Sequence, residues 1–191
     1  MSITQTEAEE TLRQINRTTS RSAQWLHAQF AAPHLILWGL VWGIGYGAVA
    51  INPEWSVIWM VLGPLGGLAS FIIGWRLSRR AGIGTAQKAG LGGILARIAP
   101  FAAVFAFFQL SIMILQPMHA EQIGAFVPLV IGLIYVMGGA FPRLTRIFYL
   151  GVGLMALTAI GYYFVRDYFY AWMAIVGAGA LVLGGLWLRS V

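Results

Sequence analysis

The sequence predicts an all-α protein, a six-helix transmembrane bundle preceded by a cytoplasmic amphipathic helix. Of the 191 residues, 59% are hydrophobic and 9% are charged, and the mean hydropathy is +0.78. These values are typical of a chain that is surrounded mostly by lipid. Six apolar stretches are each about as long as a helix that crosses ~30 Å of hydrocarbon. We place these spans at residues 35–51, 56–77, 98–115, 123–141, 147–165 and 168–188.

The basic residues support this division, because they fall in alternate connections between the spans. Of the 12 Lys and Arg residues, only Arg166 lies on the opposite side. The others are Arg13, Arg17, Arg21, Arg76, Arg79, Arg80, Lys88, Arg97, Arg143, Arg146 and Arg189. Since cationic loops resist translocation, we expect both termini in the cytoplasm. The predominance of Arg, with Lys88 as the single lysine, suggests a GC-rich bacterial genome and hence a bacterial inner (plasma) membrane.

The amino-terminal segment, residues 1–33, predicts an amphipathic helix over 6–31 that ends before Pro33. The spacing of Leu12, Ile15 and Leu26 places them on one narrow apolar seam. A helix that lies in the membrane surface usually has a broad apolar face and a cationic polar face. The narrow seam therefore favours packing against this chain's own bundle, a sister subunit or a partner. The alternative is a solvated lead-in that only fixes the topology.

The transmembrane domain, residues 34–191, begins with a span that carries a double G-x-x-x-G pattern. Gly39, Gly43 and Gly47 recur every four residues, so they share one face that another helix can approach closely. Beside them runs an aromatic stripe, Trp38, Trp42 and Tyr46. Aromatic residues at helical spacing usually pack, so we favour packing or lipid contact over a ligand-stacking ladder.

The ionisable residues do not form a chemical site in the sequence. Glu54, Glu121 and Asp167 fall in the three predicted outer turns, where charges stay hydrated, and His34 and His119 fall at opposite sides of the membrane. No ionisable residue stands in the middle of a predicted span, which counts against proton relays and ion-coupled carriers. Cysteine is absent. We therefore expect no catalytic residue, cofactor or metal.

Three function classes remain, and two of them lead. The first is a non-enzymatic regulatory or scaffold subunit that acts through helix–helix contacts, and the second is a passive channel or facilitator for a small neutral solute. For the second, the candidate pore-lining residues are Gln109, Ser111 and Tyr135. A lipid-modifying enzyme ranks third. A continuous polar path across the bundle would favour the facilitator over the scaffold.

The expected partners follow from the same charges and seams. Anionic lipids of the inner leaflet attract basic residues near the membrane, so the lipid bilayer itself is a partner. The amino-terminal seam and the glycine face favour a homo-oligomer or a membrane or cytoplasmic protein as a further partner. The net charge of +6 comes from basic residues that set the orientation of the spans in the membrane. We therefore expect no nucleic-acid binding.

Overall fold

The computed structural model describes residues 29–80, 103–104, 106–116, 119–140 and 144–190, and every regular element in these ranges is helical. The first helix is Gln29–Ile51, and a short helix is Ala106–Leu115. The labelled elements are η1 (Pro53–Ile58), α2 (Trp59–Arg80), α4 (Ala120–Gly139), α5 (Thr145–Phe164), η2 (Arg166–Tyr168), α6 (Phe169–Trp172), η3 (Met173–Gly177) and α7 (Ala178–Arg189). The last four form one continuous segment, Arg166–Arg189, which we call the last span.

Five helical segments are long and apolar enough to cross a membrane, which indicates a multi-pass membrane protein. They are Gln29–Ile51, Pro53–Arg80, Ala120–Gly139, Thr145–Phe164 and Arg166–Arg189. The third predicted span, 98–115, is described only over 103–104 and 106–115, where the apolar helix Ala106–Leu115 is shorter than a membrane crossing. The predicted amphipathic helix lies outside the described residues except for its last three positions.

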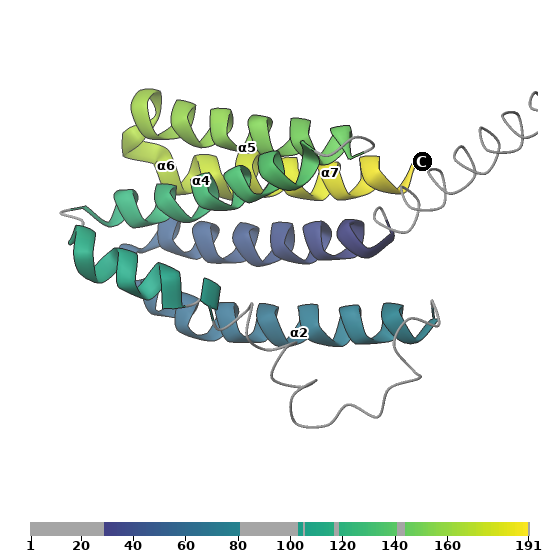
Figure 1. Ribbon diagram of the computed structural model, residues 1–191. Helices are drawn as coiled ribbons and strands as arrows, with labels where there is room; N and C mark the ends of the chain where they lie inside the picture. The colour runs from purple at the N-terminus through teal and green to yellow at the C-terminus, as the bar shows by residue number, and fades with distance from the viewer. Residues whose placement is uncertain (1–28, 81–102, 105, 117–118, 141–143, 191) are drawn as a thin grey trace, which may run out of the picture.

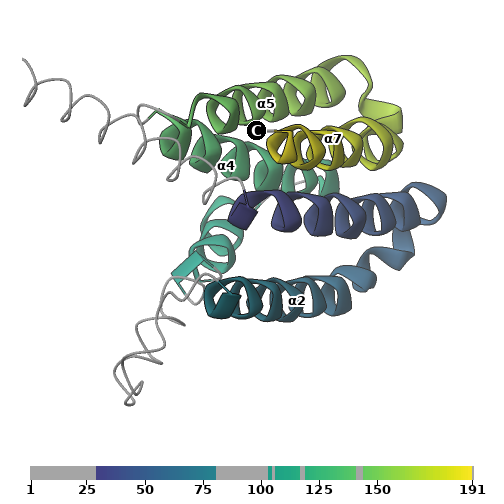
Figure 2. The ribbon, with the colours of Figure 1, turned by 90° about the vertical axis from the view of Figure 1, so that its right-hand side faces the viewer.

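The long helices lie side by side and run in alternating directions (Figure 1). The first helix is central: α4, α5 and the last span pack on one side of it, and α2 lies on the other side (Figure 2). The short helix lies between the levels of α4 and α2. Hence α2 is a peripheral helix, whereas the first helix contacts both layers.

Two predicted boundaries are wrong for local reasons. The chain is helical from Gln29 through Pro33 to Ile51, so Pro33 does not separate two helices. Ala32 is fully buried against the last span, and packing of this kind holds a helix together across a proline in lipid. The second span begins before residue 56, with a 3₁₀ turn at Pro53 in which the Asn52 side chain accepts a hydrogen bond from the Glu54 N–H at 2.9 Å.

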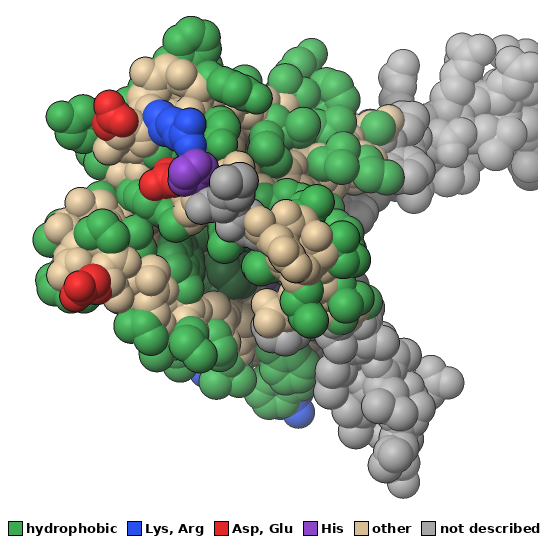
Figure 3. Space-filling model, turned by 90° about the vertical axis from the view of Figure 1, so that its left-hand side faces the viewer, with side chains coloured by type: hydrophobic (Ala, Val, Ile, Leu, Met, Phe, Trp, Pro, Cys, Tyr) green, Lys and Arg blue, Asp and Glu red, His purple; other side chains and the backbone are tan. Residues whose placement is uncertain are grey.

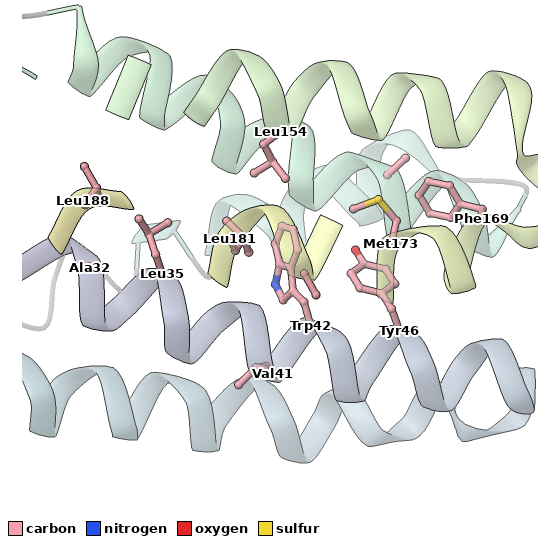
Figure 4. Close-up of a cluster of buried hydrophobic side chains, with 12 residues drawn as sticks. Ala32, Leu35, Val41, Trp42, Tyr46, Leu154, Phe169, Met173, Leu181 and Leu188 are labelled. Atoms are coloured by element: carbon pink, nitrogen blue, oxygen red, sulfur yellow. The ribbon is translucent and has the colours of Figure 1, made fainter. Parts of the chain in front are cut away.

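The core lies between the first helix and the last span (Figure 4). The first helix contributes Ala32, Leu35, Val41, Trp42 and Tyr46, and the last span contributes Phe169, Met173, Ala178, Leu181 and Leu188. Leu154 of α5 and Ala125 of α4 complete the buried cluster. The last span contains a π-helical turn at Met173–Gly177, which the sequence pattern did not predict. Such turns add one residue to a helix and shift the faces on either side of it.

Tight backbone contacts join α4 and α5, and a Cβ at Gly139 would overlap the Phe148 backbone nitrogen. A Cβ at Gly151 would lie 2.5 Å from the Gly132 carbonyl oxygen and 2.6 Å from the Val136 nitrogen. A Cβ at Gly132 would in turn lie 3.0 Å from the Gly151 carbonyl oxygen. The two helices therefore meet backbone to backbone, a geometry that only small residues permit in lipid.

Two substitutions on α5 test this contact with a matched control. Gly151→Ala should lower the free energy of unfolding by about 1–3 kcal/mol, because the added methyl group overlaps the α4 backbone. Gly153→Ala should be neutral or stabilising by up to about 1 kcal/mol, because no described atom lies within 4 Å of that Cβ and alanine is the better helix former. Thermal unfolding of the purified protein in detergent measures both. Equal effects at the two positions would contradict the packing account.

Candidate functional site

The glycine face of the first helix lies against the last span. A Cβ at Gly39 would be 2.6 Å from Val182 Cγ2 and 3.0 Å from the Ala178 carbonyl oxygen. At Gly43 and Gly47 the distances to the Cβ atoms of Ala178 and Ala174 are 3.7 and 3.9 Å, which are ordinary contacts. The helices therefore approach most closely at Gly39 and diverge slightly towards Gly47.

A glycine of the last span makes the reciprocal contact, and sequence reasoning did not single it out. A Cβ at Gly185 would lie 2.9 Å from the Ala32 carbonyl oxygen and 2.7 Å from Ile36 Cγ1. Because each helix offers a glycine to the backbone of the other, the pair is held by mutual close approach. The signal for Gly185 was present, since the sequence of the last span is rich in glycine, but the sequence gives no partner for any of these glycines.

The aromatic stripe is divided between two interfaces. The Trp38 indole Nε1 donates a hydrogen bond to the Ser70 hydroxyl of α2 at 3.1 Å. Trp42 and Tyr46 are instead buried in the core, with 4% and 3% of their surfaces exposed. Tyr46 also packs edge to face against the rings of Trp59 and Phe169. The stripe therefore packs and leaves no stacking surface for a ligand in this part of the chain.

A proline in α4 explains the single hydrogen bond of the buried Tyr46 hydroxyl. Pro128 is fully buried and has no N–H, so the carbonyl of Gly124, four residues earlier, lacks its usual helical donor. The Tyr46 hydroxyl donates to that carbonyl oxygen at 2.7 Å. Lipid offers no water to satisfy a freed carbonyl, so a neighbouring helix must supply the donor. Tyr46 thereby fastens the first helix to α4.

A double-mutant cycle tests this pairing. Tyr46→Phe should lower the free energy of unfolding by about 1–3 kcal/mol, because the Gly124 carbonyl is then left without the tyrosine donor. In a Pro128→Ala background the same change should cost less than about 1 kcal/mol, because the alanine N–H replaces that donor. Chemical or thermal denaturation in detergent gives the four stabilities. A cost of Tyr46→Phe that is the same in both backgrounds would refute the link to Pro128.

The three candidate pore-lining residues are not brought together. Gln109 is exposed on the short helix, whereas Ser111 is partly buried on another face of that helix. Tyr135 of α4 faces α5, since its Cβ would lie 2.9 Å from a Cβ at Gly151. Ser111 lies near the start of α4, and thirteen residues from Gln122 to Tyr135 correspond to about 20 Å along a helix. Ser111 and Tyr135 therefore lie far apart along the direction of α4, and the three residues do not form one cluster among the described helices.

Ser111 does share a pocket with a residue that sequence reasoning missed. A cavity of about 320 Å³ lies between the short helix and α4, and it is lined by Ser111, Ile112, Leu115, Gln122, Ile123 and Phe126. Gln122 caps α4, since its side-chain oxygen accepts a hydrogen bond from the His119 N–H at 3.2 Å. His119 is not one of the usual capping residues, so the sequence contains only a weak signal for this helix start. Gln122 and Ser111 are the two polar residues of the pocket lining.

The two ends of the bundle differ in charge. Glu54, Glu121 and Asp167 lie in η1, in the first turn of α4 and in η2, all at one end, which we call the acidic end (Figure 3). The opposite, basic end carries Arg76, Arg79, Arg80, Arg146 and Arg189. There the Arg146 guanidinium donates to the Trp187 carbonyl oxygen at 2.7 Å and lies over the Trp187 ring. It thus adds a donor from α5 to a carbonyl at the end of α7 that also accepts from the Ser190 hydroxyl at 2.8 Å.

The predicted separation of the histidines agrees with these ends. His119 precedes α4 at the acidic end, whereas His34 is in the first helix near the basic end. The seam residues Leu12, Ile15 and Leu26 lie outside the described residues.

Comparison of the chain with protein-family models, curated proteins and solved structures finds no match.

Proposed function

We propose that this protein is a non-enzymatic regulatory or scaffold subunit that acts through helix–helix contacts in the membrane. The observation that carries this proposal is the surface of α2, which buries only Gly66 and Ser70 along its 22 residues. The large apolar side chains that it exposes are Met60, Val61, Leu65, Leu68, Phe71, Ile72 and Trp75. Lipid can cover such a surface, but a second feature of α2 favours a protein helix.

That feature is a pair of partly buried glycines, Gly63 and Gly67, which lie between the exposed apolar surface of α2 and its face towards the first helix. No described atom lies within 4 Å of a Cβ built at either position, whereas glycines between the packed helices are in contact with a neighbour. Association of helices in lipid depends on close backbone approach, because the hydrophobic effect gives no advantage there. We infer that a transmembrane helix, from a second copy or from another membrane protein, packs against these glycines. The amino-terminal seam, Leu12, Ile15 and Leu26, is a second candidate contact.

Bulky substitutions on α2 test this proposal against a matched control. Gly63→Leu combined with Gly67→Leu should abolish crosslinking to the partner helix and reduce co-purification at least tenfold, while the bundle still folds. Gly179→Leu should leave association unchanged, because Gly179 is equally open but lies on α7. Crosslinks to a second copy double the apparent mass, which separates a homo-oligomer from a different partner. Association that survives the double substitution would remove the main support for the scaffold function.

A passive facilitator for a small neutral solute is the second candidate, and the pocket beside Ser111 and Gln122 supports it. Its lining combines two polar side chains with apolar surface, as sites for small uncharged molecules do. Osmotic swelling of proteoliposomes discriminates the two functions. Swelling that is lost in a Ser111→Leu, Gln122→Leu variant but kept in the α2 variant would favour the facilitator.

We further propose that the protein lies in a bacterial inner membrane with six spans, cytoplasmic termini and the basic end against anionic inner-leaflet lipids. The support is the distribution of charge, since the described arginines other than Arg166 lie at the basic end. Tags placed at residues 1 and 191 should therefore be protected from protease in intact spheroplasts and cleaved in inverted vesicles. Cleavage of either tag from the outside would contradict this topology.

A further inference from the structure

Both ring nitrogens of His34 face backbone carbonyl oxygens, one on its own helix and one on α2. Nδ1 lies 2.7 Å from the Phe30 carbonyl oxygen, and Nε2 lies 3.1 Å from the Ser70 carbonyl oxygen. A carbonyl oxygen can only accept a hydrogen bond. A neutral imidazole has one N–H donor and one lone pair, so it can satisfy only one of these contacts, whereas the imidazolium ion donates to both.

We propose that His34 is a proton-dependent contact that fastens α2 to the first helix when it is protonated and releases α2 when it is neutral. In the neutral form with the proton on Nδ1, the Nε2 lone pair faces the Ser70 carbonyl oxygen, and this repulsion is relieved when the two helices separate. With the proton on Nε2, the Nδ1 lone pair faces the Phe30 carbonyl oxygen, and rotation of the ring relieves that repulsion but breaks the bond to Ser70. Protonation replaces the repulsion with a second, charge-assisted hydrogen bond. Histidine changes charge between about pH 5 and 8. Lowering the pH through this range therefore favours the arrangement in which α2 is held against the first helix.

The polar groups in contact with the His34 ring are the two carbonyl oxygens, and the described residues at this end of the bundle carry cations and no acid. The described part of the first helix contains no Asp, Glu, Lys or Arg, and neither does the short helix. On α2 the charged groups are Arg76, Arg79 and Arg80, and the Arg79 guanidinium lies over the Trp75 ring at 4.7 Å. The last span brings Arg189 to the same end. Arg146 of α5 is the remaining described cation there, and it caps α7.

The remaining contacts between the first helix and α2 are few, so the His34 contact can decide their association. Trp38 donates to the Ser70 hydroxyl, and its ring lies 3.2 Å from a Cβ built at Gly66. Nearer the acidic end the Trp59 ring packs on Gly45. Since α2 buries only two residues, these contacts hold it more weakly than the core holds the last span. These contacts set the position of α2 against the first helix, whichever partner α2 binds.

Spin labels on the two helices measure this movement directly. The chain has no cysteine, so cysteines at Leu40 and Phe71, which are 57% and 52% exposed, can be labelled specifically. Between pH 5.5 and 8.0 the ratio of short to long label distances should fall about tenfold in the parent, as the loss of one charge-assisted hydrogen bond implies. His34→Gln should make this ratio independent of pH, and His119→Gln should leave the parent response intact. A parent ratio that does not change, or a His34→Gln ratio that changes as in the parent, overturns the proposal.

A second measurement leaves His34 in place, in case His34→Gln does not fold. The chain has three histidines, so combining His27→Gln with His119→Gln leaves His34 as the only one. In this variant the ¹⁵N signals of the imidazole should change from the charged to the neutral form between pH 5.5 and 8.0, together with the label distances. A charge state that stays the same throughout this range, or that changes while the distances do not, overturns the proposal.

Discussion

The close contact between the first helix and the last span is the constraint on which the rest of the bundle depends. Each helix presents a glycine to the backbone of the other, Gly39 against Ala178 and Gly185 against Ala32. In lipid, this approach brings dispersion contacts that longer side chains would prevent. It also aligns the buried side chains of both helices into one core, to which α4 and α5 add Ala125, Leu154 and a surrounding layer of partly buried apolar side chains.

Side-chain hydrogen bonds to backbone carbonyls join helices that are far apart in the sequence. Pro128 frees the Gly124 carbonyl, and Tyr46 supplies a donor from another helix. At the exposed end of α7 the Trp187 carbonyl accepts from the Ser190 hydroxyl of its own helix, and Arg146 adds a donor from α5. Because the bilayer core contains no water, the gap at Gly124 requires a side chain from elsewhere in the chain. These bonds therefore fix which helices are neighbours as well as how closely they pack.

The helices differ in how firmly they are held, and α2 is the least buried of the long ones. Its contact with the first helix combines the hydrogen bond from Trp38, the ring of Trp59 on Gly45 and the two carbonyls around His34. Its outer surface carries exposed apolar side chains, and two open glycines lie at the edge of that surface. A helix with few internal contacts can move or exchange partners more readily than a core helix. This links the proposed partner contact and the proton-dependent contact through one element.

The sequence by itself determined that the chain is helical, apolar enough to cross a membrane several times, and opposite in charge at its two ends. These properties follow from composition, span length and the order of charges, which are local and additive. Only the tertiary structure decided that Gly39 and not Gly43 makes the tight contact, that Tyr135 lies away from Gln109 and Ser111, and that Gln122 shares a pocket with Ser111. Periodicity gives the face of a helix but not its neighbour. The neighbour is set by which helix can fill a gap or donate to a free carbonyl, and those atoms are far apart in the sequence.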